Sequence, residues 1–480
     1  MRGKRLITIA ALAAISLPVF AIRHIRWGSS AGPLNGLTIT WTNNGTSDSI
    51  RWGYTPSYEM GAFAGIMRNG YSDKFFKHVF PTVNPNSTIY YQLYDSNTQS
   101  WGMQKTFAAA PPSNTTAFSF CALGDSRNGL SVWQQVSNLA NSQAASFTLY
   151  NGDIVDNGGS ASEWNNWFNS GTAYLENNIV YHALGNHDAQ SVPTYKNIFD
   201  LPHVNGSNLY YSFTYGNALF ITLNSEDPAN QAQASWLVST LSAAASDPSI
   251  IWKVVSFHRP FYTIGAHAGE MNAYFGTWWK AFDDYGVDLI VNGHDHMYER
   301  TKPINRNVST GSPVASYGSQ PGQGRCQIVC GGAGAPLYTG TPTWAIEKYQ
   351  SKYNFCKFSI NGYELCGTTY DNYGNIIDTF CINKSGPGTG FGNSSTIFNS
   401  ISVYPNPVQS MLTIDYFSSQ LGEATILVYN MAGQEVVRKE VLKEEQKLLV
   451  KLDMSVYARG AYTVQVVMGR QKDNLLIVLQ

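Results

Sequence analysis

Several short apolar runs in the middle of the chain end in side chains that bind metal ions. Residues 179–184 lead into Gly185-Asn186-His187-Asp188, so an amide, an imidazole and a carboxylate follow one another where a buried strand would end. Four other runs of β-branched and aromatic residues have the same form, and they are followed by Asp125, by Asp153, by His258, and by His294 with His296. Ligands of open α/β sheets bind beyond the carboxyl ends of the strands, so five such ends predict one shared site.

The kinds of side chain in this set indicate a metal site. A single His or Asp after a strand is more often a turn residue, but five of the nine histidines lie on or just after these strand ends: His187, His258, His267, His294 and His296. No Cys-x-x-Cys pair occurs in the chain, which argues against a structural zinc site. Carboxylate, imidazole and one amide oxygen suit iron, zinc or manganese. Six candidate ligands exceed the need of one open catalytic metal, so we predict two metal ions that share a carboxylate.

The order of these motifs, GD…GDxxD…GNHD…H…GHxH, resembles that of the calcineurin-like metallophosphoesterases. The motifs FHRPFY at residues 257–262 and GHDHMYER at residues 293–300 are similar to those of the purple acid phosphatase branch of that family. The resemblance covers roughly Asp125 to Arg300. It implies an α/β/β/α sandwich that hydrolyses phosphoric esters.

The resemblance also implies a role for each residue. One metal would be held by Asp125, Asp153 and His296, and Asp153 would bridge to a second metal held by Asn186, His258 and His294. In the family mechanism a metal-bound hydroxide attacks phosphorus, and the metals offset charge on the phosphoryl oxygens. His187 would protonate or stabilise the leaving alkoxide, and His267 would lie near the phosphate.

Two positions depart from the purple acid phosphatase pattern. That branch has a tyrosine ligand three residues after the bridging aspartate, where this chain has Asp156, so we expect no purple chromophore. Asp156 either binds the first metal or orients His187 through a carboxylate–imidazole hydrogen bond, and we favour the second interpretation. Arg127 stands where many family members have a histidine ligand. Its guanidinium would either contact substrate phosphate in a bidentate way or form a surface ion pair.

Composition and the N-terminal residues indicate an exported protein. A net charge of -1 and a pI of about 6.7 give no electrostatic footprint for binding nucleic acid. Three basic residues precede an apolar run from Leu6 to Phe20, and residues 19–21 fit a cleavage site. We therefore predict a secretory signal peptide over residues 1–21 rather than an uncleaved anchor. The run is short for a transmembrane helix, and no other stretch qualifies, so we expect no stable transmembrane segment.

The six cysteines fit an oxidising compartment. Cys121 lies within the first of the strands that carry ligands, and we predict a buried thiol there. The other five follow the last metal motif, where we expect one or two disulfides whose pairing the sequence does not give: Cys326, Cys330, Cys356, Cys366 and Cys381.

Changes in pattern divide the chain into three folded parts. Short strands with turn signals over residues 22–112 predict a β-sandwich, similar to the fibronectin-type domain that precedes the catalytic domain in plant-type purple acid phosphatases. Over residues 116–384 strands alternate with helical stretches at 130–140, 231–245 and 271–285, which would cover the faces of the sheets. Residues 385–400 have the composition of a flexible linker.

Residues 401–480 predict a small separate β-sandwich, because alternating strands are joined by Gly turns. Their amino-acid sequence closely resembles the C-terminal sorting domain of type IX secretion cargo. That family implies the type IX machinery as a partner and export from the periplasm of a Gram-negative bacterium to its surface or beyond. A carbohydrate-binding or adhesion module is the alternative, but no clustered aromatic platform supports it, since Tyr404, Tyr429 and Tyr462 each sit in strand register.

We therefore predict a secreted phosphomonoesterase that uses two metal ions and acts on a small-molecule phosphate ester. A phosphodiesterase or nucleotide pyrophosphatase would use the same six ligands, because substrate choice lies in loops. The alternative from another class is a surface binding protein with a degenerate site. The intact ligand set argues against it, since a binding module has no need of Asn186 and His187 together.

Overall fold

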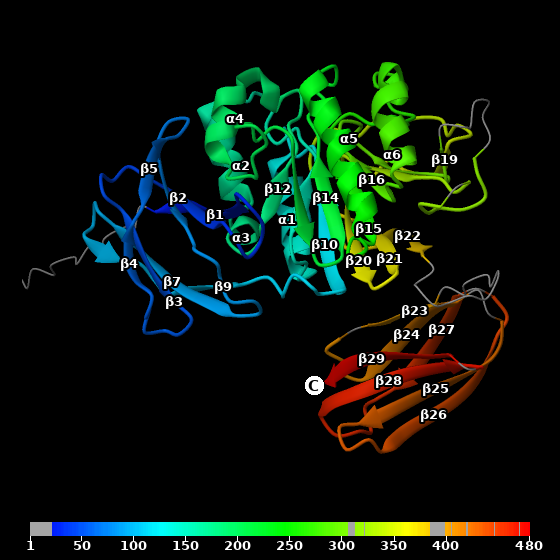
Figure 1. The fold of residues 1–480 in the computed structure, drawn as a ribbon. Coiled ribbons are helices and arrows are strands. Elements are labelled where there is room, and N and C mark those ends of the chain that lie inside the picture. The colour runs from blue at the N-terminus through cyan, green and yellow to red at the C-terminus, as the bar shows by residue number, and fades with distance from the viewer. Residues whose placement is uncertain are drawn as a thin grey trace, which may run out of the picture. The chain divides into compact units, whose positions relative to one another are not determined.

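The computed structural model describes residues 22–305, 313–320, 322–384, 399–404, 406–418, 421–445, 447–469 and 471–480. The chain forms two compact units, residues 1–385 and 386–480, and each is described by itself (Figure 1). The expected signal peptide and residues 385–398 of the expected linker lie outside the described residues. Among the described residues, none of the helices has the length and apolar character needed to span a bilayer.

The first unit begins with a sandwich of two antiparallel sheets. Its strands are β1 (Arg23–Ser29), β2 (Leu37–Asn43), β3 (Ser49–Gly53), β4 (Gly61–Ala64), β5 (Ile66–Asn69), β6 (Lys74–Val79), β7 (Thr88–Asp95), β8 (Ser100–Trp101) and β9 (Lys105–Ala108). One sheet has the order β1-β2-β6-β5 and the other β4-β3-β7-β8, with β9 beside β7. In β7, Ile89, Tyr91 and Leu93 are buried and alternate with more exposed neighbours, because successive side chains of a strand point to opposite faces.

Two larger sheets form the centre of the first unit. One contains β10 (Ala117–Leu123), β11 (Thr148–Tyr150), β12 (Val180–His182), β20 (Asn354–Asn361), β21 (Glu364–Asp371) and β22 (Ile376–Asn383). The other contains β13 (Tyr211–Tyr215), β14 (Ala218–Thr222), β15 (Trp252–Ser256), β16 (Leu289–Asn292), β17 (Tyr298–Thr301), β18 (Cys326–Cys330) and β19 (Ile346–Gln350). Their orders are β12-β11-β10-β20-β21-β22 and β13-β14-β15-β16-β18-β17-β19.

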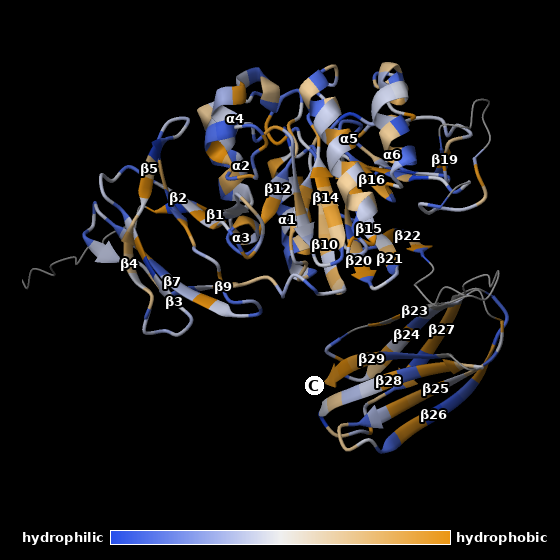
Figure 2. Ribbon diagram, in the orientation of Figure 1, coloured by the Kyte–Doolittle hydropathy of each residue, from blue (hydrophilic) through white to orange (hydrophobic). Residues whose placement is uncertain are grey.

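These two sheets pack face to face with helices outside them, and many of their strands are apolar in Figure 2. The ring centroids of Phe120 in β10 and Phe220 in β14 lie 5.1 Å apart between the sheets. The helices are α1 (Leu130–Ser142), α2 (Ala161–Ser170), α3 (Thr172–Leu175), α4 (Val192–Ile198), α5 (Gln231–Ser246) and α6 (Lys280–Asp284), with the short turns η1 (Asp188–Ser191), η2 (Asn272–Tyr274) and η3 (Phe275–Trp279). Leu241 of α5 and Phe282 of α6 pack with Val255 on the outer face of the second sheet.

The helices at 130–140 and 231–245 form as predicted, whereas the third is broken into η2, η3 and α6. Its middle turn is a π-turn that contains Trp278 and Trp279, both fully buried. Adjacent residues of a regular α-helix point about 100° apart. The local widening therefore lets two large neighbouring rings enter the same core.

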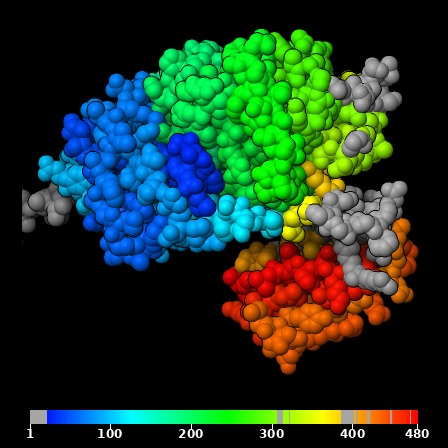
Figure 3. All heavy atoms as spheres, viewed as in Figure 1, coloured from blue at the N-terminus to red at the C-terminus, as the bar shows by residue number. Residues whose placement is uncertain are grey.

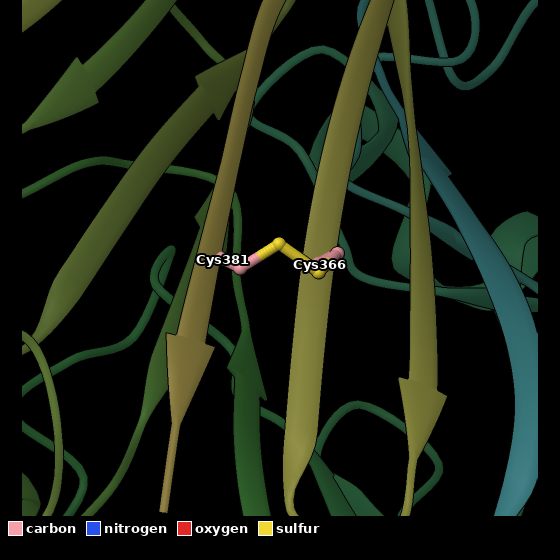
Figure 4. The surroundings of a disulfide bond; sticks show 2 residues. All are labelled: Cys366 and Cys381. Carbon is pink, nitrogen blue, oxygen red and sulfur yellow. A yellow bond between two sulfur atoms is a disulfide. The ribbon is translucent and has the colours of Figure 1, made fainter. Parts of the chain in front are cut away.

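One disulfide, Cys366–Cys381, joins neighbouring strands β21 and β22, with a Cα–Cα distance of 4.0 Å (Figure 4). The sequence predicted one or two disulfides in this region without giving their pairing. The remaining cysteines are buried free thiols: Cys121, Cys326, Cys330 and Cys356.

The second unit is a β-sandwich of its own. Its strands are β23 (Asn399–Tyr404), β24 (Met411–Ser418), β25 (Gly422–Asn430), β26 (Glu435–Lys443), β27 (Lys447–Asp453), β28 (Gly460–Met468) and β29 (Gln471–Leu479). They form the sheets β23-β24-β27 and β26-β25-β28-β29. Leu412, Ile426 and Val464 are buried between the sheets, which accounts for the alternation seen in the sequence.

The N-terminal sandwich and the α/β part of the first unit share an ionic contact, and their surfaces adjoin in Figure 3. Asp200, just after α4, accepts two hydrogen bonds from Arg68 at 2.9 and 2.8 Å, and it pairs with Lys77 at 3.2 Å. Thr40 donates to the same carboxylate at 2.7 Å. Burial opposes charge on Asp200, but the two cations and the hydroxyl outweigh it and lower the pKa of this carboxyl.

We expect Asp200→Asn to lower the free energy of unfolding by about 2–4 kcal/mol at neutral pH, because it leaves two partly buried cations unpaired. The folded pKa of Asp200 lies below its unfolded value of about 3.9, so the carboxylate stabilises the fold above that value. The loss should shrink as the pH falls through the folded pKa. Urea titrations at neutral and strongly acidic pH measure it, and Glu347→Gln, an exposed carboxylate of β19, is the control.

Candidate metal centre

The candidate ligands follow the carboxyl ends of parallel strands in both central sheets. Strands β10, β11 and β12 are parallel neighbours in the first sheet, and β15 and β16 are parallel neighbours in the second. The residues that follow these ends are Asp125 (β10), Asp153 (β11), Asn186 and His187 (β12), His258 (β15), and His294 and His296 (β16). Each sheet thus presents its share of the set at one edge, as the sequence predicted.

Among the six predicted ligands, two groups of three ligand atoms form, and Asp153 belongs to both. The first group is Asp125, Asp153 and His296, and the second is Asp153, His258 and His294, with the ligand atoms of each group within 4.8 Å of one another. Asn186 adjoins the second group, since its Oδ1 lies 3.0 Å from Nε2 of His258. The structure therefore brings all six predicted ligands together around one shared carboxylate.

Two of the imidazoles are oriented by main-chain carbonyl groups. Nδ1 of His258 donates to the carbonyl oxygen of Asn151 at 2.7 Å, and Nδ1 of His296 donates to that of Pro336 at 2.7 Å. A carbonyl oxygen can only accept, so Nδ1 of each ring carries a proton, and Nε2 of each ring faces the ligand group. Nε2 of His296 is buried without a hydrogen-bond partner among the described residues. An unpaired buried nitrogen aimed at two carboxylates fits a metal ligand.

His294 is turned the other way round. Its Nδ1 lies 3.0 Å from Nε2 of His258, and its Nε2 lies 3.1 Å from the carboxylate of Glu270. Arg259 pairs with Glu270 and is itself held by Glu226 at 2.8 Å. Nε2 of His294 therefore faces both Glu270 and Nη1 of Arg259, which lies 3.2 Å away, while Nδ1 faces the second group.

The backbone at three ligands has an uncommon conformation. The φ angles of Asp125, Asp153 and His294 are 62°, 53° and 71°, in the left-handed region that residues other than glycine rarely occupy. Such positions cost of order 1–3 kcal/mol each and are found at functional sites. Gly185 leaves room for this arrangement, because a Cβ there would lie 2.2 Å from the backbone nitrogen of Asp153.

Opposite charges offset the burial of the ligands. Burial raises the pKa of Asp125 well above its usual range. Burial also opposes charge on Asp153 and on His258, but the pair outweighs it, so the pKa of Asp153 is lowered and that of His258 is raised to about 10. Burial lowers the pKa of His296 to about 4 and also lowers that of His294. Those two rings are neutral at physiological pH, which is the form that binds metal.

His187, Asp156 and Arg127 lie beside the first group. Nδ1 of His187 donates to the carbonyl oxygen of Asp156 at 2.7 Å, and the carboxylate of Asp156 is farther away, at 3.3 Å. That carboxylate pairs with Nη1 of Arg127 at 2.7 Å. Nε of Arg127 also lies 3.4 Å from Asp153, and the arginine side chain is only 15% exposed. The ion pair of Arg127 therefore lies beside Asp153, with the arginine largely buried and the Asp156 side chain 39% exposed.

His267 lies on the side of the second group. Its Nδ1 is 2.9 Å from the carboxylate of Asp295, and its ring centroid is 3.8 Å from that of His294. Tyr338 stacks on His296 with the ring centroids 4.2 Å apart. The sequence reasoning missed both Tyr338 and Glu270. The spacing of Glu270, three residues after His267, was a usable signal, whereas the loop of Tyr338 carries none.

Comparison with known proteins identifies two parts of the chain. The calcineurin-like phosphoesterase family matches residues 119–298, which include all six candidate ligands. Residues 119–298 are a calcineurin-like phosphoesterase domain. The secretion system C-terminal sorting domain matches residues 402–480, so the second unit is a type IX sorting domain.

Relatives and solved structures agree with this assignment. An uncharacterized protein of Mycobacterium tuberculosis is 25% identical over 392 residues, 68% of this chain and 73% of that protein. Purple acid phosphatase 1 of Ipomoea batatas is 24% identical over 318 residues, 59% of this chain and 64% of that protein. Purple acid phosphatase PPD1 from yellow lupin seeds has a TM-score of 0.64 at 17% identity, covering 76% of this chain and 74% of that one. PhoD has a TM-score of 0.56 at 10% identity, covering 78% and 95%; both likenesses concern the fold.

The phosphoesterase domain makes this chain a metal-dependent phosphoester hydrolase. The predicted fold class is confirmed, because β-sandwiches at both ends flank a central metallophosphoesterase fold. The likeness of the N-terminal sandwich to a fibronectin-type domain stays a prediction.

We expect Glu270→Gln to weaken metal binding by about 10- to 100-fold, because the ring of His294 loses the carboxylate that lies 3.1 Å from its Nε2 and pairs with Arg259. The bound metal is measured by elemental analysis after dialysis against graded concentrations of a chelator. Glu347→Gln should bind metal as the wild type does. Unchanged metal retention by Glu270→Gln would show that His294 does not depend on this contact.

Proposed function

We propose that the chain is a secreted phosphomonoesterase that holds one metal ion at each ligand group. This proposal is supported above all by the place of Asp153 in both groups, where its carboxylate can bridge two metal ions. Iron, zinc and manganese all suit the donor set of carboxylates, imidazoles and one amide. Metals bound there would activate water and offset charge on the phosphoryl oxygens.

The chain's own residues would handle substrate and protons around that pair. Nδ1 of His187 donates to the Asp156 carbonyl, so Nε2 faces the site, and in the doubly protonated ring Nε2 would give its proton to the leaving alkoxide, leaving the neutral ring with its proton on Nδ1. Arg127 would contact the phosphate through guanidinium N–H groups that do not bond to Asp156. His267, whose Nδ1 faces Asp295, would turn its Nε2 toward the phosphate.

Monoesters are the proposed substrates because relatives that cover part of this chain carry names of phosphatases. Besides the purple acid phosphatases, a phosphoenolpyruvate phosphatase of Allium cepa is 28% identical over 175 residues, 32% of this chain and 35% of that protein. We infer that small phosphate monoesters fit this site as well.

We also propose that the type IX machinery delivers the protein from the periplasm to the cell surface or the medium. The sorting domain over residues 402–480 supports this route. The disulfide between Cys366 and Cys381 fits passage through an oxidising compartment. The boundaries 22–112, 116–384 and 401–480 remain our proposal for the three folded parts.

The wild type should hydrolyse an aryl phosphate monoester faster than the matching diester and bind about two metals per chain. His187→Asn should keep the metals and lose about 10²- to 10⁴-fold in kcat on an alkyl phosphate, whose leaving group needs the proton, and much less on the aryl phosphate. Asp153→Asn should lose both metals, since it weakens both groups at once. Elemental analysis and steady-state kinetics test these outcomes. Faster diester turnover would assign the chain to the phosphodiesterases, and no turnover by the metal-loaded wild type would contradict an enzyme.

The iron-loaded protein should have no visible charge-transfer band from tyrosinate to iron, because Asp156 stands at the tyrosine position and pairs with Arg127. An absorption spectrum of the oxidised protein with a known iron content measures it. Asp156→Tyr supplies the missing phenol and should introduce such a band. A purple wild type would mean that another tyrosine ligates the iron.

A further inference from the structure

Residues 156–158 form a turn that contacts His187, and residues that are not candidate ligands hold this turn in place. Besides the bond from Nδ1 of His187 to the Asp156 carbonyl, the backbone nitrogen of Gly158 donates to the carbonyl oxygen of His187 at 3.1 Å. A Cβ at Gly158 would lie 2.3 Å from the carbonyl oxygen of Asp188, so the turn packs directly on the main chain after His187. The position of residues 156–158 therefore decides where the ring of His187 points.

Helix α2 holds this turn through its first residues. The carboxylate of Glu163 accepts hydrogen bonds from the backbone nitrogens of Asp156 and Asn157, both at 2.8 Å. The indole of Trp164 donates to the carbonyl oxygen of Gly158 at 2.9 Å. The main chain of all three turn residues is thus bonded to two neighbouring side chains of α2.

The direction in which Glu163 reaches is unusual for its place in the helix. Ser160 is the N-cap and its Oγ accepts from the backbone nitrogen of Glu163 at 3.3 Å. In an ordinary capping box the glutamate at this position returns to the backbone nitrogen of the N-cap residue. Here that nitrogen donates instead to the carbonyl oxygen of Asn157 at 2.9 Å. The carboxylate is left for the turn that carries the Asp156 carbonyl.

The surroundings of Glu163 argue against a role in core packing. Its side chain is part-exposed and lines a cavity of about 500 Å³ together with Arg127, Asp156 and Asn166. A partly solvated carboxylate contributes little apolar burial. Its two charge-assisted hydrogen bonds to the turn are its main contacts.

We propose that Glu163 is a positioning residue for proton delivery by His187, acting through the main chain of Asp156. This inference rests on the proposed function, in which His187 assists the leaving group. Loss of the carboxylate frees the backbone nitrogens of Asp156 and Asn157, and the carbonyl that fixes Nδ1 of His187 shifts with them. The ring then turns away from the leaving oxygen while the metal ligands stay in place.

The test compares an aryl phosphate, whose leaving group needs little protonation, with an alkyl phosphate, whose leaving group needs much. Glu163→Ala should lower kcat for the alkyl phosphate at least tenfold and for the aryl phosphate less than about threefold. Glu163→Gln keeps an oxygen acceptor and should recover most of the alkyl activity. If the alanine variant does not fold, Glu163→Asp, whose carboxylate is one methylene shorter, replaces it.

Ser160→Ala is the matched control, since it removes the cap of the same helix and leaves the carboxylate of Glu163 in place. It should lower thermal stability and keep the ratio of alkyl to aryl activity. Metal content should equal that of the wild type in every variant. Imidazole nitrogen NMR of the metal-free protein should show a single tautomer of His187 in the wild type and a mixture in Glu163→Ala.

His187→Asn separates failure of the inference from failure of the proposed function. If His187→Asn shows no selective loss on the alkyl phosphate, the role of His187 as proton donor is wrong, and the inference is wrong with it. If His187→Asn shows that loss and Glu163→Ala lowers both substrates equally, or leaves the tautomer unchanged, only the inference is overturned. Selective loss in both variants supports both.

Discussion

One buried carboxylate has to serve two groups of ligands, and the architecture of the first unit depends on that constraint. Asp153 comes from the first sheet, whereas His258, His294 and His296 come from the second. The sandwich of two sheets is therefore part of the site, because neither sheet alone supplies a full group. Burial works against the charge of Asp153, and the nearby His258 outweighs it.

The left-handed backbone at Asp153 is held by residues of the loop after β12. The carboxylate of Asp188 accepts from the backbone nitrogens of Ile154 at 3.0 Å and Gly185 at 3.1 Å, which joins the loop after β11 to the loop after β12. The backbone nitrogen of His187 donates to Asp153 itself at 3.0 Å. The motif GNHD thus supplies more than a candidate ligand and a proposed proton donor, since its glycine and its aspartate stabilise the strained turn.

The sequence predicted which side chains lie together because strand ends have a clear pattern, an apolar run followed by Gly and a polar side chain. It did not predict what orients them. His258 and His296 are fixed by the main-chain carbonyls of Asn151 and Pro336, and a carbonyl group is the same in every residue. The prediction of one continuous helix over residues 271–285 was wrong for a related reason, since apolar spacing does not reveal that two adjacent tryptophans are buried together. Patterns of residue type specify faces and ends of elements, whereas tertiary packing decides their local distortion.

The two departures from the purple acid phosphatase pattern are best understood as one replacement. Arg127 and Asp156 are 29 residues apart in the sequence, which does not show that they are partners, but their side chains pair at 2.7 Å. Either charge alone would disturb the first group, because an unpaired guanidinium would repel metal ions and an unpaired carboxylate would add a ligand. Together they are neutral. The pairing also explains why His187 bonds to the carbonyl of Asp156 and not to its carboxylate, which Arg127 already engages. The orientation of His187 thus depends on main-chain position, and main-chain position is what the first turn of α2 controls.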